Sequence, residues 1–440
     1  MFIRNFNKFK RKLSIYNVYI ENMKEYAIIY NTCSGKICKI SKPLDIIYNK
    51  NVIDLLTQKG FLVDERIDEF QELLNVSRSI AEDTNHPNVD ITLAPSLKCN
   101  MRCKYCFENG IKLESKLKVI TEQTLEDVEN FILGIANRES VENLNLIWFG
   151  GEPLLESELI IKFSNLIRKK LQPSKQMHVR IITNGLLLSF DMLHSLISGC
   201  GLESVQISID GLQDRYSQTH QVSGRVFEKV VDNIILSSNY IKTTIRLNTS
   251  MSNINDIYKL IEMLSIKINR KDNVIFKISE IINYNNIENF PVETYNFGTF
   301  RNFYRELARY IHNLGFNQEC DYIEGFYPLG CKYYYKNNYV IDPNGNLYKC
   351  EHHMGEHDFI LGNVALGLQQ ESDCHHIYYN HLIDERCKAC NIYPICKYAS
   401  CQDYRQFVSS TPCNIYTEQL NAIITDIVSN FESLSIDIIN

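Results

Sequence analysis

Residues 91–107 read ITLAPSLKCNMRCKYCF and combine a predicted strand with a cysteine motif. Its first part, Ile91–Pro95, is a short β-prone run that favours a buried strand. Its second part places Cys99, Cys103 and Cys106 in a C-x3-C-x2-C spacing. Three thiolates this close together in a loop suit three corners of a cubane iron–sulfur cluster, which would leave one iron open to a small molecule. A zinc site completed by a distant ligand, or three packed thiols, is the alternative.

β-prone runs and amphipathic helical runs alternate from residue 91 onward. Helices are expected near Glu122–Ala136, Val226–Ser237 and Ile254–Leu264, where apolar residues form one stripe. The expected strands are Ile91–Pro95, Asn145–Phe149, Val179–Thr183, Ser204–Asp210, Thr244–Thr249 and Val274–Ile281. Strands that alternate with helices form βα units and a parallel sheet. We therefore predict an α/β fold, a partial (β/α)6 barrel of the TIM type that binds ligands at the carboxyl ends of its strands.

A motif directly follows each of the first four expected strands. Residues 99–106 follow the first strand, residues 150–153 (GGEP) the second, residues 183–185 (TNG) the third and residues 210–211 (DG) the fourth. Glycines permit the close approach of a backbone, and a carboxylate such as that of Glu152 accepts hydrogen bonds from an ammonium group. Because the carboxyl ends of parallel strands share one edge of the sheet, these motifs are expected to form one pocket.

The cysteine spacing resembles the signature of the radical S-adenosylmethionine (radical SAM) superfamily, including the aromatic residue Tyr105 before the third cysteine. The resemblance implies that Cys99, Cys103 and Cys106 hold a 4Fe–4S cluster whose open iron chelates S-adenosylmethionine. It further implies that an electron from a donor such as flavodoxin or ferredoxin cleaves the cofactor. The resulting 5′-deoxyadenosyl radical abstracts a hydrogen atom from the substrate, and the protein supplies positioning and the exclusion of competing reactions.

The resemblance extends to the later strand ends. Residues 150–153 resemble the segment that meets the amino group of the methionine moiety, and residues 207–211 resemble the ribose-contacting strand. The positions that the resemblance assigns to cofactor binding are Tyr105, Gly150, Gly151, Glu152, Asn184, Ser208 and Asp210. Many relatives carry an Arg about ten residues after that Asp, where this chain has His220. Arg246 on the fifth expected strand is a substitute partner for the carboxylate of the cofactor, or a structural ion-pair residue.

A second cysteine field lies in residues 319–413 and resembles the seven-cysteine SPASM domain of radical enzymes that modify peptides and proteins. Four residues separate Cys396 from Cys401, where the family usually has three. The resemblance implies two auxiliary 4Fe–4S clusters, the first on Cys331, Cys350 and Cys401, with Cys320 as a fourth ligand or an open iron, and the second on Cys387, Cys390, Cys396 and Cys413. Two zinc-ribbon sites are the alternative. Residues 341–348 are expected to form a hairpin that turns at Pro-Asn-Gly.

The composition narrows the class of protein. The 440 residues carry a formal net charge of −6 and are 45% hydrophobic, which favours a large core and argues against a nucleic-acid binder. No apolar run of about 18 residues indicates a membrane span, and the basic N-terminal stretch lacks the apolar segment of a secretory signal. The 15 cysteines therefore indicate metal binding in a cytoplasmic protein rather than a disulfide framework.

Five regions are expected along the chain. They are a small winged-helix-like α+β module at 1–90, the radical SAM core at 91–281, a helical bridge at 282–318, the SPASM domain at 319–413 and a C-terminal helix at 414–440. The first module resembles leader-binding domains of enzymes that mature ribosomal peptides, in which a strand edge pairs with an extended leader. Tyr26–Tyr30 or Lys36–Ile40 would supply that edge.

We interpret the chain as a radical SAM/SPASM peptide maturase that forms a thioether or carbon–carbon crosslink in a precursor peptide with a leader. The first alternative is a sulfatase-type maturase that oxidises a Cys or Ser to formylglycine, which shares both cysteine fields but usually lacks a front module. The second is a non-catalytic iron–sulfur or zinc scaffold, which would need no cofactor pocket. The catalytic acid or base is unknown, because no spacing selects among Tyr322, Glu324 and Tyr327.

Overall fold

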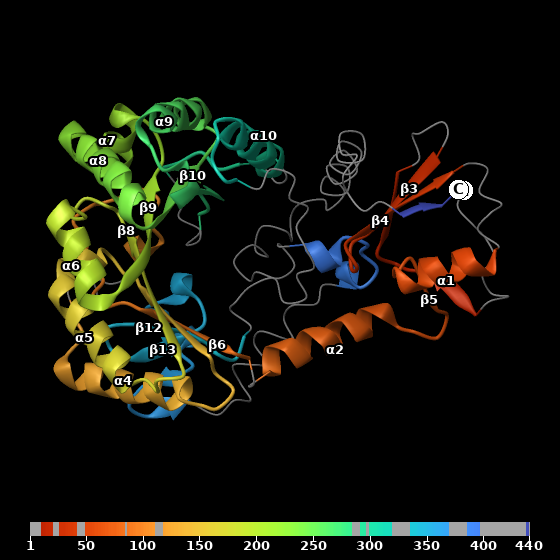
Figure 1. Ribbon diagram of the computed structural model, residues 1–440, viewed down its shortest axis with the longest axis horizontal. Coiled ribbons are helices and arrows are strands. Elements are labelled where there is room, and N and C mark those ends of the chain that lie inside the picture. Colours follow the sequence, from red (N-terminus) through yellow and green to blue (C-terminus); the bar gives the residue numbers. More distant parts are fainter. Residues whose placement is uncertain are drawn as a thin grey trace. The chain divides into compact units, whose positions relative to one another are not determined.

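The computed structural model describes residues 10–20, 26–41, 49–83, 86–110, 118–283, 291–295, 299–318, 335–368, 385–396 and 437–439. The chain divides into two compact units (Figure 1). The first comprises Met1–Asp83, Asp321–Tyr335 and His375–Asn440, and the second comprises Thr84–Cys320 and Lys336–Cys374.

The second unit is built on a ten-stranded sheet with the order β11-β10-β9-β8-β7-β6-β12-β13-β14-β15. Six neighbouring strands are parallel and follow the chain order: β6 (Asn88–Leu93), β7 (Asn143–Trp148), β8 (Gln176–Thr183), β9 (Leu202–Ile209), β10 (Lys242–Thr249) and β11 (Val274–Glu280). The predicted parallel sheet of βα units is confirmed.

The first five of these strands begin two or three residues before the predicted positions. Four of the five begin with a polar residue (Asn88, Asn143, Gln176 and Lys242), which is not part of an apolar pattern, and polar side chains pair across the sheet at the start of β6 and β7. The amide of Asn143 donates to the side chain of Asn88 over 2.9 Å, and that of Asn145 donates to Asp90 over 2.7 Å. Cross-strand polar pairs therefore extend the sheet beyond its apolar centre.

Helices connect the parallel strands and lie along one side of the sheet (Figure 1). They are α4 (Glu122–Ala136), α5 (Ser157–Lys170), α6 (Phe190–Cys200), α7 (Gln213–His220), α8 (Gly224–Tyr240) and α9 (Ile254–Lys267), and a further helix, α10 (Thr299–Asn313), follows β11. The predicted helix at Glu122–Ala136 is confirmed with its bounds, and the side chain of Thr121 caps its first turn. Trp148 is fully buried at the end of β7 and packs edge-on against Phe163 of α5, which closes the core beneath the strand ends.

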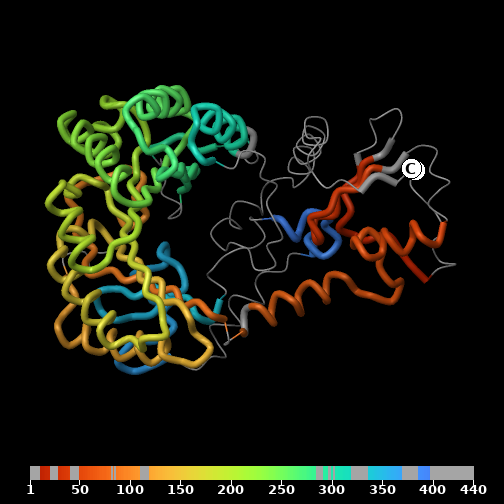
Figure 2. Tube along the Cα trace, in the orientation of Figure 1, coloured from red at the N-terminus to blue at the C-terminus, as the bar shows by residue number. Residues whose placement is uncertain are grey.

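Four short strands continue the sheet beyond β6. They are β12 (Asn338–Ile341), which is parallel to β6, and then β13 (Asn346–Tyr348), β14 (Gly362–Asn363) and β15 (Gly367–Leu368), which are antiparallel. Figure 2 traces β12 alongside β6 although the two are far apart in the sequence. The predicted hairpin at 341–348 is confirmed, because Gly345 turns with a positive φ of 79° and its N–H donates to the carbonyl of Asp342.

The first unit contains a four-stranded sheet with the order β16-β4-β3-β2 and a two-stranded ribbon of β1 and β5. Its elements are β1 (Arg11–Leu13), β2 (Asn17–Ile20), β3 (Tyr26–Asn31), β4 (Lys36–Ser41), α1 (Lys50–Gln58), β5 (Leu62–Asp64), α2 (Glu69–Glu82) and β16 (Asp437–Ile439). The predicted strand pair at Tyr26–Tyr30 and Lys36–Ile40 is present as the antiparallel pair β3–β4.

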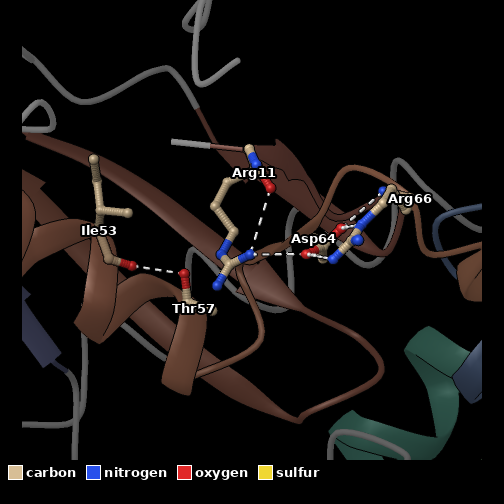
Figure 3. A network of polar contacts seen from close by, with 6 residues as sticks. Arg11, Ile53, Thr57, Asp64 and Arg66 are labelled. Atoms are coloured by element: carbon tan, nitrogen blue, oxygen red, sulfur yellow. Dashed lines mark hydrogen bonds and ion pairs between the residues drawn. The ribbon is translucent and has the colours of Figure 1, made fainter. Parts of the chain in front are cut away.

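Polar contacts fix the ribbon of β1 and β5 (Figure 3). The guanidinium groups of Arg11 and Arg66 both reach the carboxylate of Asp64, at 3.2 and 2.9 Å. Hydrogen bonds from Arg66 hold the pKa of Asp64 well below its usual range. In the neighbouring helix α1, the hydroxyl of Thr57 donates to the carbonyl of Ile53 over 2.8 Å.

Two expectations for the first unit are corrected. Residues 414–436 of the expected C-terminal helix lie outside the described residues, but Asp437–Ile439 is a strand that pairs in parallel with β4. Neither β3 nor β4 offers the expected edge, because β3 lies between β2 and β4, and β4 lies between β3 and β16. Among the described strands of this sheet, β2 and β16 are the outer ones.

Candidate active site

The loop that carries Cys99, Cys103 and Cys106 follows β6 and ends in a short 3-10 helix, η3 (Phe107–Gly110). On one side, the N–H of Glu152 donates to the carbonyl of Lys98 over 2.7 Å. On the other side, the N–H groups of Arg102 and Lys104 donate to carbonyls at the end of α7, over 3.2 and 2.9 Å. The loop is therefore held between the segments that follow β7 and β9.

Cys103 is influenced electrostatically by the other two thiols of the loop. Burial raises the pKa of Cys103 well above its usual value, and the neighbouring Cys106, Asp210 and Cys99 raise it further. In the described ranges, no three His, Cys, Asp or Glu side chains are arranged to hold one metal ion. The ligands of a cubane cluster instead bind separate irons. An all-sulfur donor set on one short loop fits a 4Fe–4S cluster with three protein ligands.

Gly150 and Gly151 let the end of β7 approach the backbone of the cysteine loop. A Cβ at Gly151 would lie 2.3 Å from the carbonyl oxygen of Lys98, and one at Gly150 would lie 2.3 Å from that of Ser96. Gly150 also has a φ of 115°, which L side chains rarely adopt. The close approach expected from these glycines therefore exists, and it is made toward the loop that carries the thiols.

Glu152 is fully buried and joins the ends of β7 and β8. Its carboxylate accepts hydrogen bonds from the N–H of Leu154, the hydroxyl of Thr183 and the N–H of Asn184, over 3.0, 2.7 and 2.8 Å. Burial raises the pKa of this carboxyl group, although the three donors oppose the shift. Through these contacts Glu152 holds the ends of β7 and β8 together. Its expected contact with an ammonium group stays a prediction.

Asn184 connects the end of β8 to the cysteine loop. Its side-chain amide donates to the side-chain oxygen of Asn100 over 2.6 Å, and its own oxygen accepts from the N–H of Leu186. Asn100 was not predicted as a site residue, because an asparagine between two cysteines of the motif carries no recognisable signal. The third strand end thus reaches the same loop as the second.

Asp210 reaches the cysteine loop through His220. Its Oδ1 lies 2.6 Å from His220 Nε2, and His220 Nδ1 lies 2.9 Å from the Sγ of Cys103. Asp210 and His220 are each 2% exposed. The sequence marked His220 as a departure from the resemblance, but not as a neighbour of Cys103.

Tyr105, Ser208 and Arg246 lie around the ends of β9 and β10. The hydroxyl of Tyr105 accepts from the amide of Asn248 over 3.0 Å, and Arg246 Nε donates to the other side-chain atom of that amide over 2.9 Å. Ser208 pairs with Arg246 in the register of the two strands, and both are half-buried. Burial raises the pKa of Tyr105 well above its usual value, and the charge of Asp210 adds to this.

The second cysteine field is divided between the two units. Cys350 belongs to the second unit. Two residues further on, His352 packs its ring edge-on against Phe107 of the cysteine loop, with ring centroids 4.8 Å apart. Cys387, Cys390 and Cys396 belong to the first unit, and the N–H of Cys390 donates to the carbonyl of Cys387. The remaining expected ligands and the three acid–base candidates lie outside the described residues: Cys320, Cys331, Cys401, Cys413, Tyr322, Glu324 and Tyr327.

A parallel βα sheet with a three-cysteine loop at the carboxyl end of its first strand is the arrangement expected of an enzyme that uses an iron–sulfur cluster and S-adenosylmethionine. Residues 93–264 match the model of the Radical SAM superfamily, so the chain carries a radical SAM domain. This leaves the scaffold alternative without support. No helix in the described ranges is long and apolar enough to cross a membrane.

The chain is similar to known maturases over most of its length. It is 24% identical over 371 residues to the cysteine-type anaerobic sulfatase-maturating enzyme of Clostridium novyi, covering 76% of this chain and 93% of that protein. The structure of anSMEcpe with bound AdoMet has a TM-score of 0.59 and 18% identity, covering 78% of this chain and 100% of that one. Streptococcus suis SuiB bound to precursor peptide SuiA has a TM-score of 0.52 and 14% identity, covering 91% and 97%. At these identities the structural likeness concerns the fold.

Proposed function

We propose that this radical SAM enzyme modifies a ribosomal precursor peptide and forms a thioether or carbon–carbon crosslink in it. The observation that carries the proposal is the loop of Cys99, Cys103 and Cys106, which residues after β7, β8 and β9 contact at one edge of the sheet. When bound there, the cluster and S-adenosylmethionine would supply the radical that abstracts a hydrogen atom from the peptide. A flavodoxin or ferredoxin in the cytoplasm is the proposed electron donor.

Different residues of this chain would bind the cluster and S-adenosylmethionine. The three thiolates would ligate three irons, and Arg246 would meet the carboxylate of S-adenosylmethionine, because a guanidinium group binds a carboxylate through two parallel hydrogen bonds. Ser208, next to Arg246 in the register, is placed to contact the same molecule. Glu152 and Asn184 would keep the strand ends and the loop in place while the substrate exchanges.

Peptides bound in the solved structures of both similar proteins support a peptide substrate, and the difference in coverage supports a front module. SuiB, which was solved with its precursor peptide, matches 91% of this chain, whereas anSMEcpe matches 78%. We propose that residues 1–90 bind the leader of the precursor by strand addition. The outer strand β2 (Asn17–Ile20) is the proposed edge, because β16 covers the far edge of β4.

The leader site can be tested on the full chain and on a variant that lacks residues 437–440. A labelled candidate precursor peptide should bind both proteins with equal affinity if the leader pairs with β2. If deletion of β16 tightens binding, the leader pairs with β4 instead. No binding to either protein would refute the assignment of residues 1–90 to leader recognition.

The activity can be tested with the reconstituted, reduced protein under anaerobic conditions. We expect 5′-deoxyadenosine to form, and the peptide to lose two hydrogen atoms while it keeps all of its sulfur. A change of Cys103 to Ala, which removes one ligand, should abolish both products. A fully cluster-loaded protein that forms no 5′-deoxyadenosine would refute the proposal.

Sulfatase maturation is the second candidate, and the similarity to the Clostridium novyi enzyme over 93% of its length favours it. This reaction would convert a Cys or Ser side chain to formylglycine, whose aldehyde reacts with hydrazide probes. A hydrazide-reactive product would support this candidate, whereas a crosslinked product that does not react with the probe would support the first.

A further inference from the structure

We propose that His220 is a positioning residue that donates a hydrogen bond from Nδ1 to the Sγ of Cys103 and thereby raises the reduction potential of the cluster at Cys99, Cys103 and Cys106. The proposal concerns the cluster and not the peptide substrate, so its test is independent of the proposed crosslinking activity. It assigns a role to the position at which the chain departs from its relatives.

The ring of His220 lies between two hydrogen-bond acceptors. Its Nδ1 is 2.9 Å from the Sγ of Cys103, and its Nε2 is 2.6 Å from Oδ1 of Asp210. A cysteine sulfur that ligates iron is a thiolate and only accepts hydrogen bonds. The ring nitrogen that faces it must therefore be the donor, while the carboxylate of Asp210 holds the ring from the other side.

The orientation of this ring is fixed by its surroundings. The ring of Tyr216 stacks on it with centroids 4.0 Å apart, and Tyr105 packs against it edge-on at 6.0 Å. The backbone of His220 is also engaged, because its carbonyl accepts from the N–H of Arg102 in the cysteine loop. With 2% of the residue exposed, water has little access to replace the ring as a donor. The end of helix α7 thus places Nδ1 of His220 beside the Sγ of Cys103.

A hydrogen bond to a ligating sulfur draws electron density from the cluster and favours its reduced form. Hydrogen bonds to the sulfurs are among the factors that set the potential of iron–sulfur clusters, and residues behind the first ligand commonly tune a metal site. Cleavage of S-adenosylmethionine needs the reduced cluster. We therefore expect loss of the donor at Nδ1 to lower the midpoint potential and the fraction of cluster that a given reductant can reduce.

Two substitutions separate the donor from its anchor. Asn carries its amide nitrogen at the position of histidine Nδ1, so His220→Asn keeps a donor to Cys103 and loses the contact with Asp210. Gln carries its amide nitrogen at the position of Nε2, so His220→Gln keeps the contact with Asp210 and loses the donor to Cys103. Both variants are uncharged amides and differ by one methylene.

The readout is a redox titration followed by EPR, restricted to the cluster signal that changes when S-adenosylmethionine is added. We expect His220→Gln to lower the midpoint potential by more than His220→Asn does, at equal iron content and equal melting temperature. Equal shifts in both variants, or no shift in His220→Gln, would overturn the proposal and leave His220 a structural residue.

A measurement on the wild-type protein guards against variants that fail to fold. In protein labelled with ¹⁵N-histidine, pulsed EPR of the reduced cluster should detect a weak coupling to one histidine nitrogen through the N–H···S hydrogen bond. The coupling should disappear in any folded His220→Gln sample. Its absence in wild-type protein would refute the hydrogen bond itself.

Discussion

Replacement of Gly151 by Ala should displace the loop that carries the three cysteines. A Cβ at this position would lie 2.3 Å from the carbonyl oxygen of Lys98 and 2.5 Å from that of Leu97. The shorter contact is about 1 Å inside the ordinary van der Waals limit of 3.4 Å. Both neighbours are backbone atoms, so the new methyl group cannot be accommodated by rotation of a side chain. Since Cys99 directly follows Lys98, the loop must move with its first ligand.

The expected size of the effect follows from this displacement. Overpacking a well-packed site costs about 1–3 kcal/mol of unfolding free energy, so the variant should still fold. A shift of about 1 Å at a site that needs its ligands placed within about 0.5 Å should nevertheless lower cluster occupancy. A misplacement of this size can reduce an enzymatic rate on the order of 100-fold. Formation of 5′-deoxyadenosine should therefore fall far more than stability does.

The assay compares iron content, melting temperature and 5′-deoxyadenosine formation in wild type, Gly151→Ala and a matched control. The control is Gly134→Ala in helix α4, where a Cβ meets nothing within 4 Å. That change should stabilise the protein by about 0.4–1 kcal/mol and leave the activity unchanged. If Gly151→Ala takes up full iron and cleaves S-adenosylmethionine at the wild-type rate, the close approach of the β7 end does not hold the cysteine loop.

Three further outcomes are expected. Reconstituted protein should hold roughly twelve irons per chain if all three sites are cubanes, and Cys103→Ala should hold about four fewer; an unchanged iron count would contradict the ligand assignment. Burial raises the pKa of Cys200 to about 11, so its thiolate is scarce at neutral pH. Alkylation of Cys200 at pH 8 should therefore be about 100-fold slower than in the unfolded chain, and its rate should rise with pH. Equal alkylation rates in the folded and unfolded chains, measured by mass spectrometry, would contradict this prediction. Thr183→Val removes a donor to the buried Glu152 carboxylate and should cost about 1–3 kcal/mol in urea unfolding, whereas Thr57→Val in α1 should change stability by less than about 0.5 kcal/mol.

The parallel sheet could be predicted because its strands are apolar and each is followed by a recognisable motif. Ile91, Leu146 and Val179 lie side by side in the register and are fully buried, which is the pattern that the sequence shows. The strand starts could not be placed, since Asn88 and Asn143 join the sheet through a side-chain pair that only the register reveals.

The first unit was harder to predict because its contacts are distant in sequence. A buried network joins Ser14, Ile15 and Glu69, in which the Glu69 carboxylate accepts from the hydroxyl of Ser14 and the N–H of Ile15. Such pairs leave no periodic signal. The strand Asp437–Ile439 is three residues long and pairs with β4 near the other end of the chain, so local propensity could not distinguish it from a helix end.

The site shows why a motif can be predicted when the role of its residues cannot. Gly151, Glu152 and Asp210 were expected to meet the cofactor, and the contacts that the structure gives them are with the cysteine loop or with residues that touch it. Contact with the cofactor and support of the cysteine loop are compatible roles, because a group that supports the loop also lies beside the space next to the thiols. The glycines and Glu152 support the loop at Lys98, and His220 supports it at Cys103, so the loop is fixed on both sides of its first two thiols. Under the proposed function, specificity for one peptide would arise from residues outside this loop and its supports, and the leader-binding experiment on the first unit tests this.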